Sequence, residues 1–166
     1  MDSAELKSAQ APLKARYRED PAAALVTLRA EGRLADGGVS CSVSTGRALV
    51  EAGLHPATGG TGLLACSGDM LLEALVACAG VTLRAVATSL ELDVSGTVHA
   101  EGDLDFRGTL GVGKGEGVPV GFTAIRLRFD LEHDEDEAAI AKLLELTERY
   151  CVVFQTLTGG VPVEVS

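Results

Sequence analysis

The sequence contains no tryptophan, and its aromatic residues are limited to two tyrosines and four phenylalanines. Apolar residues still make up 46% of the chain, so the core has to be built from aliphatic side chains, mainly leucine, valine and alanine. A chain of 166 residues suits one compact domain that buries about two thirds of its unfolded surface. We therefore expect residues 1–166 to form a single domain.

The chain also lacks an excess of positive charge. Its 14 lysines and arginines are outnumbered by 24 aspartates and glutamates, which gives a formal net charge of −10 at pH 7. Nucleic acids and anionic membranes are bound through basic surfaces, so we expect neither of them as a partner. Acidity of this kind is typical of an ordinary soluble protein.

No secretory signal is evident, because residues 1–5 are polar. The most apolar stretch, residues 70–86, is interrupted by Glu73 and Arg84 and is shorter than the ~20 residues of a membrane span. This pattern predicts a buried core helix and a cytoplasmic protein. In a reducing compartment, four cysteines are more often free, catalytic or metal-bound than joined in disulfides.

Hydrophobic periodicity predicts an α+β fold. The segment at 69–90 is apolar on most sides, as a central enclosed helix is, and strict alternation at 120–131 is typical of a strand. The expected elements in chain order are a peripheral helix within 1–22, strands at 25–34, 39–43 and 47–52, a glycine-rich loop at 53–68, the helix at 69–90, strands at 94–100, 103–110 and 120–131, a helix at 134–150 and a closing strand at 161–165.

Two cysteines lie on the apolar faces of the two main expected helices. Cys78 has small apolar neighbours, and Cys151 continues the apolar stripe of the later helix. Both thiols should point toward the core, where they can meet, although a disulfide would require Cα atoms within about 7 Å. Spacing alone leaves open that each is a buried cysteine acting as a small hydrophobic residue.

The surroundings of these cysteines resemble the OsmC/Ohr family of thiol-dependent peroxidases. The likeness covers about residues 25–165, and two blocks carry it: Gly68-Asp69-Met70-Leu71-Leu72-Glu73-Ala74-Leu75-Val76-Ala77-Cys78 with Thr82-Leu83-Arg84-Ala85-Val86-Ala87, and Leu146-Thr147-Glu148-Arg149-Tyr150-Cys151-Val152-Val153 with Thr156-Leu157. The resemblance implies an OsmC-like fold, with antiparallel sheets wrapped around a long central helix. It also implies an entwined homodimer with its sites at the subunit interface.

The same resemblance assigns roles to individual residues. It implies that Cys78 is the thiolate that attacks the peroxide and that Cys151 is the resolving thiol. The family usually carries an acid nine or ten residues before the first cysteine, and Asp69 stands at nine. That acid orients an arginine from the N-terminal strands, for which Arg33 is the best match and Arg29 the reserve. No metal or other cofactor is implied.

The expected chemistry requires an ionised thiol at Cys78. A free cysteine, with a pKa near 8.5, is mostly protonated at neutral pH, and apolar neighbours raise the pKa further. A cation such as Arg33, held by Asp69, would offset this. Attack on an organic hydroperoxide gives a sulfenic acid, Cys151 condenses with it, and an external dithiol restores the pair. The aliphatic surroundings favour apolar hydroperoxides over hydrogen peroxide.

One departure from the family pattern leaves an alternative open. The family commonly has Cys-Pro-Val-Ser where this chain has Cys151-Val152-Val153-Phe154. The chain therefore also fits a non-catalytic module of the same fold that binds a small ligand or senses redox state, or a dimeric scaffold with structural thiols. Cys66 and His55 carry no spacing typical of zinc, so we expect no metal site and an exposed loop position for His55.

Overall fold

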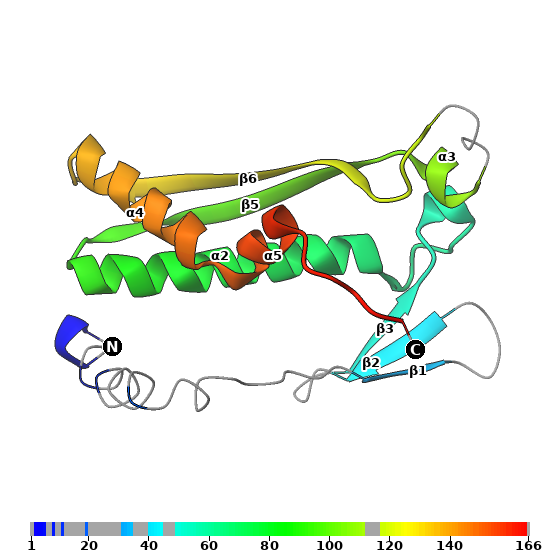
Figure 1. Cartoon of the computed structure of the whole chain (residues 1–166), viewed down its shortest axis with the longest axis horizontal. Coiled ribbons are helices and arrows are strands. Elements are labelled where there is room, and N and C mark those ends of the chain that lie inside the picture. The colour runs from blue at the N-terminus through cyan, green and yellow to red at the C-terminus, as the bar shows by residue number, and fades with distance from the viewer. Residues whose placement is uncertain are drawn as a thin grey trace. The chain divides into compact units, whose positions relative to one another are not determined.

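The computed structural model describes residues 2–5, 8, 11, 19, 31–34, 40–44, 49–111 and 117–165, with side chains described outside 31–49. Its strands and main helices are shown in Figure 1. In chain order they are β1 (Glu31–Leu34), β2 (Ser40–Ser44), β3 (Leu49–Gly53), the 3-10 helix η2 (Pro56–Thr58), β4 (Ala65–Cys66), α2 (Ser67–Leu90), β5 (Val94–Leu104), α3 (Phe106–Thr109), β6 (Phe122–His133), α4 (Glu137–Tyr150) and α5 (Val152–Gly159).

The chain divides into two compact units. The first unit comprises residues 1–27, 75–99 and 128–166, and the second comprises residues 28–74 and 100–127. Each unit is described by itself below.

The core of the first unit follows from the spacing of apolar residues along α2. Leu75, Ala79, Leu83 and Ala87 lie four residues apart and are all buried, because this spacing places them on one helix face. Leu83 and Ala87 join a cluster that includes Val94 of β5 and Leu143 of α4, against which Phe129 and Leu131 of β6 also pack. This cluster anchors α4 beside α2.

The ends of the helices explain where the chain turns. Asp136 caps α4 by accepting a 2.7 Å hydrogen bond from the Ala139 N–H. After α2 the backbone turns at Glu91, whose φ is +60°, and the Leu92 N–H donates to the Ala87 carbonyl over 2.9 Å. Glycine usually occupies this left-handed position, so Glu91 is strained there.

The second unit contains a four-stranded sheet in the order β1-β2-β3-β4. The first three strands are antiparallel, with Arg33 opposite Ser42, whereas β4 runs parallel to β3. The 3-10 helix η2 is capped by His55, whose Nδ1 accepts a hydrogen bond of 3.1 Å from the Ala57 N–H. The N-terminal turn of α2 follows β4 directly, so this sheet leads into the long helix.

Most of the expected elements are present. The helix expected at 69–90 is α2, and the strand expected at 120–131 is β6. Expected strands at 39–43 and 47–52 correspond to β2 and β3, and the described residues 3–5, 8, 11 and 19 of the N-terminal segment are helical. The part of the first expected strand before residue 31 lies outside the described residues, as does Arg29.

Three expectations about local structure were wrong. The strand expected at 103–110 ends at Leu104, because Asp105 accepts a hydrogen bond from the Arg107 N–H and caps the short helix α3. The closing strand expected at 161–165 is absent, because this extended segment forms no ladder with any described residue. In addition, the helix α5 was not expected.

The apolar helix α2 begins two residues before the expected start at Asp69. With 24 residues, α2 is the one helix among those described that is long and apolar enough to cross a membrane. A core helix of a soluble protein passes the same test, and α2 carries the exposed Glu73 and Arg84. The Arg84 guanidinium donates a 2.6 Å hydrogen bond to the Val94 carbonyl, so α2 is tied to β5.

Candidate thiol site

Cys78 and Cys151 come together in the first unit. Cys78 is half-buried on α2, whereas Cys151 is completely buried at the end of α4. Both cysteines are free, and the Cys151 thiol donates a hydrogen bond to the Cys78 sulfur. Two sulfurs that are 73 residues apart in the sequence are thus direct neighbours.

The position of Cys151 results from the packing of α4. Thr147 and Cys151 lie four residues apart on the face of α4 that is buried against α2. The Thr147 hydroxyl donates to the Leu143 carbonyl over 2.7 Å, and the Cys151 N–H donates to the Thr147 carbonyl over 2.9 Å. The polar groups next to the buried thiol are therefore satisfied within the helix.

Cys151 is also the junction between two helices. Its backbone is extended, with φ −73° and ψ 109°, so α4 stops there and α5 begins at the next residue in a new direction. No side chain caps the start of α5, and its first intrahelical hydrogen bond runs from the Gln155 N–H to the Cys151 carbonyl. The backbone of Val152, Val153 and Phe154, which follows, lowers the pKa values of the two thiols by hydrogen bonding.

These contacts lower the pKa of Cys78 below its ordinary value. Burial, the largest single influence, raises the pKa, but several hydrogen bonds to the sulfur together outweigh it. They come from the Val153 N–H, the Cys151 thiol, the Val152 N–H and the Thr82 hydroxyl. Cys78 is therefore set up to ionise more readily than an ordinary cysteine.

The pKa of Cys151 moves in the opposite direction. Burial raises it, and the contact with Cys78 raises it further, because Cys151 donates to that sulfur and lies beside its negative charge. Hydrogen bonds from the Phe154 and Val153 N–H groups only partly offset these effects. Within the pair, Cys78 is the sulfur that ionises first and Cys151 the one that keeps its proton.

The cation expected beside Cys78 is not among the described groups that shift its pKa. Arg33 lies in β1, but its side chain is outside the described part of the chain, and so is Arg29. Hydrogen bonds from backbone N–H groups at the start of α5 lower the pKa of Cys78, an effect that was expected from an arginine. Sequence reasoning missed them because it did not place a helix there.

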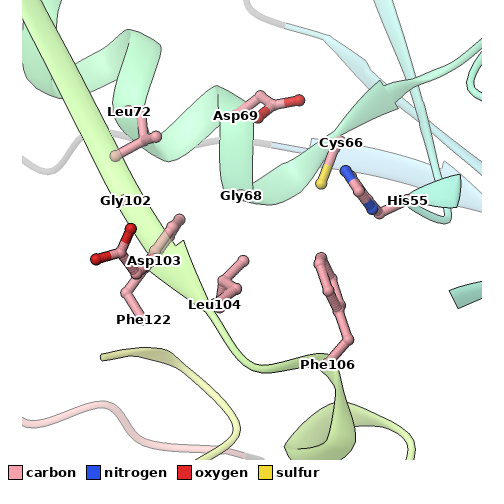
Figure 2. Close-up of a pocket in the computed structure, with 10 residues that line it drawn as sticks. All are labelled: His55, Cys66, Gly68, Asp69, Leu72, Gly102, Asp103, Leu104, Phe106 and Phe122. Atoms are coloured by element: carbon pink, nitrogen blue, oxygen red, sulfur yellow. The ribbon is translucent and has the colours of Figure 1, made fainter. Parts of the chain in front are cut away.

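Asp69 lies in the first turn of α2 and belongs to the second unit. It lines a cavity of about 360 Å³ together with His55, Cys66 and Phe106, among others (Figure 2). Its carboxylate is exposed, as a group that receives an arginine would have to be. The structure leaves the partnership of Asp69 with Arg33 as a prediction.

His55 and Cys66 also face this cavity. His55 is half-buried rather than exposed, because its ring stacks on Phe106 with centroids 4.7 Å apart. Cys66 is half-buried and free. Among the described residues, no group of three or more histidine, cysteine or acidic side chains is placed to hold a metal ion.

A second cavity, of about 560 Å³, lies in the first unit between α2 and α4. Thr82, which bonds to the Cys78 sulfur, and Tyr150, which precedes Cys151, both line it. The remaining lining is largely aliphatic: Val81, Ala85, Val86, Ser89, Leu90 and Leu146. An apolar cavity therefore adjoins the thiol pair.

Comparison with known proteins points to one family. A family-wide sequence model described as OsmC-like protein matches residues 60–166. The structure is similar to an OsmC-like protein from Mycoplasma pneumoniae, with a TM-score of 0.66 and 16% identity over 81% of this chain and 89% of that one. No curated protein matches the chain in sequence.

Two further structural neighbours carry functional names. An organic hydroperoxide resistance protein from Elizabethkingia anophelis matches with a TM-score of 0.59 and 18% identity, over 84% of this chain and 93% of that one. An organic hydroperoxide resistance protein OsmC from Legionella pneumophila matches with a TM-score of 0.57 and 18% identity, over 84% and 95%. At these identities the similarity establishes the fold.

Proposed function

The chain belongs to the OsmC-like family, and from that premise we propose that it is a thiol peroxidase that reduces organic hydroperoxides through Cys78 and Cys151. The observation that carries the proposal is the contact between two free thiols whose pKa values are shifted in opposite directions. Two cysteines that serve only to pack the core do not need pKa values shifted in opposite directions. A peroxidase requires it, because one sulfur attacks as a thiolate and the other stays protonated until it is needed.

The proposed reaction has three steps. The Cys78 thiolate attacks the terminal oxygen of the hydroperoxide, the O–O bond breaks, and the alkoxide takes up a proton and leaves as an alcohol. Cys78 is then a sulfenic acid, and the adjacent Cys151 thiol condenses with it to give a disulfide and one water. An external dithiol reduces that disulfide by exchange and is itself oxidised.

The cavity beside the thiols supports an apolar substrate. Its wall is mostly aliphatic, and Thr82 connects it to the reacting sulfur. An alkyl or aryl chain bound there would gain the free energy of apolar burial, which hydrogen peroxide cannot. We therefore infer a preference for organic hydroperoxides.

We further propose that the active form is a homodimer. In the single chain Val81 on α2 is 72% exposed, and the valines of the segment 161–165 are also exposed, so these apolar side chains are left uncovered. A second copy of this chain is the occupant that the family resemblance implies. The family resemblance also implies that an arginine held by an acid, here Arg33 and Asp69, stabilises the thiolate.

The test is peroxide-dependent oxidation of a dithiol such as dithiothreitol, with the Cys78→Ser variant as the control. We expect rapid turnover with cumene hydroperoxide, slower turnover with hydrogen peroxide, and none above background in the variant. If the two proteins oxidise the dithiol equally, the peroxidase proposal is wrong. A non-catalytic module of the same fold, binding a small apolar ligand, then becomes the better reading.

A further inference from the structure

The cavity between α2 and α4 begins one helical turn from Cys78. Its wall on α2 includes Val81, Thr82 and Ala85, which follow the cysteine by three, four and seven residues. Residues with this spacing share one face of a helix, so the wall continues the face of α2 that carries the thiol. The cavity therefore starts beside the Cys78 side chain and runs along α2 toward the end of that helix.

This cavity is long enough to hold an extended apolar group. From Thr82 to Leu90 its wall follows α2 for about 12 Å, because each residue of a helix advances the axis by about 1.5 Å. Its volume of about 560 Å³ lies within the range of small-molecule sites. Val86 of α2 and Leu146 of α4 add aliphatic walls. An unbranched alkyl chain fits this shape and this lining.

Ala85 lies in the middle of the α2 wall and has the smallest side chain of the residues that line the cavity. It is half-buried, about 10 Å along the helix axis from Cys78. We propose that Ala85 is a specificity-determining residue, whose small side chain keeps the cavity open for the extended alkyl chain of a hydroperoxide that reacts at Cys78. A larger side chain at this position would obstruct the cavity between its thiol end and its far end. The inference rests on the proposed function, which supplies the hydroperoxide.

The exposure of the lining residues favours the alkyl chain over a second copy as the occupant. Val81 and Tyr150 are 72% and 59% exposed, whereas Ala85, Val86 and Leu146 are half-buried below them. In the proposed homodimer, a second copy lying on the exposed residues would close the cavity over a bound chain. The half-buried part remains for the substrate, because it continues the helix face of the thiol.

The experiment labels Cys78 with N-alkylmaleimides and needs no peroxide. The sulfur adds to one carbon of the maleimide double bond and a proton is taken up at the other, so no electrons are exchanged. Rates for N-octylmaleimide and N-ethylmaleimide are measured on the full chain, with the Cys78 peptide quantified by mass spectrometry. Because each buried methylene group is worth about fourfold in binding, the octyl-to-ethyl ratio should exceed that of glutathione by more than about tenfold.

The Ala85→Leu variant should lose this preference and label at the octyl-to-ethyl ratio of glutathione. Ala141→Leu is the matched control, because it makes the same change at an exposed position of α4 outside the cavity lining and should keep the preference. Circular dichroism and urea unfolding establish that Ala85→Leu is folded; if it is not, Leu146→Phe narrows the cavity from α4 instead. Equal ratios in the original chain and the narrowed variant would overturn the proposal. So would the absence of any octyl preference in the original chain, the result expected if a second copy fills the cavity.

Turnover separates this inference from the proposed function. With n-octyl hydroperoxide and tert-butyl hydroperoxide, Ala85→Leu should raise the KM for the longer substrate and leave that for the shorter one nearly unchanged. An octyl preference in labelling without turnover of either substrate would refute only the proposed function. Turnover with an unchanged ratio of the two KM values would refute the role of Ala85.

Discussion

Two cysteines of this chain stand immediately before a helix, Cys66 before α2 and Cys151 before α5, and they differ in almost everything else. Cys151 is completely buried and touches the thiol of Cys78. Cys66 is half-buried beside His55 and is the only thiol among the described side chains of its unit (Figure 2). A cysteine at a helix start therefore does not by itself form a thiol pair, because a second sulfur from a distant part of the chain is required.

The two helix starts also differ in charge. The first turn of α2 contains the carboxylate of Asp69, whereas the first turn of α5 contains no acidic residue. A carboxylate near a helix start competes for the free N–H groups and disfavours a second anion beside it. The start of α5 has no such carboxylate beside the sulfurs.

The largest expected effect is a difference in dithiol oxidation between substitutions of Cys151 and of Cys66. At excess hydroperoxide, Cys151→Ser should lose most of the dithiol oxidation, because the Cys78 sulfenic acid then has no neighbouring thiol and a second hydroperoxide molecule oxidises it to the sulfinic acid. The matched control Cys66→Ser should keep full turnover. Peroxide consumption and the mass of the Cys78 peptide measure both outcomes. Sustained turnover in Cys151→Ser, or loss of turnover in Cys66→Ser, would show that Cys151 is not the resolving thiol.

The next prediction concerns ionisation. The labelling rate of Cys78 should reach half its maximum at a pH below the value of about 8.5 for a free cysteine, because hydrogen bonds stabilise its thiolate. In Cys78→Ser, Cys151 loses both its hydrogen bond to a sulfur and the charge beside it, so the pKa of Cys151 should fall from its raised value. Labelling against pH, resolved by peptide, checks both. A Cys151 pKa that does not fall in this variant would show that the two thiols are uncoupled.

Sequence periodicity was sufficient for the long elements. The apolar stripe of α2, the alternation in β6 and the stripe that leads to Cys151 each reflect one face buried over many residues, so each element could be predicted from the sequence. The inward orientation of both thiols follows from the same stripes. That they would touch required the packing of α4 on α2, which no local pattern specifies.

The short elements could not be predicted in the same way. Half of the eight residues of α5 are β-branched valines and threonines, which favour strands by propensity, yet they form a helix because Cys151 redirects the chain beside Cys78. The valines of 161–165 alternate as in a strand but have no ladder partner among the described residues. In both segments tertiary contacts, and not the local preference of the residues, determine the secondary structure.

The smallest expected effect tests whether a side-chain hydroxyl helps to lower the pKa of Cys78. Thr82 lies one helical turn after Cys78, and its hydroxyl is the weakest of the hydrogen-bonding influences on that sulfur. Thr82→Val keeps the shape and removes the hydroxyl, so the pKa of Cys78 should rise slightly. Ser89→Ala, which removes a hydroxyl from the same cavity without touching the sulfur, is the control and should not shift it. An unchanged pKa of Cys78 in Thr82→Val would show that this hydroxyl does not support the thiolate.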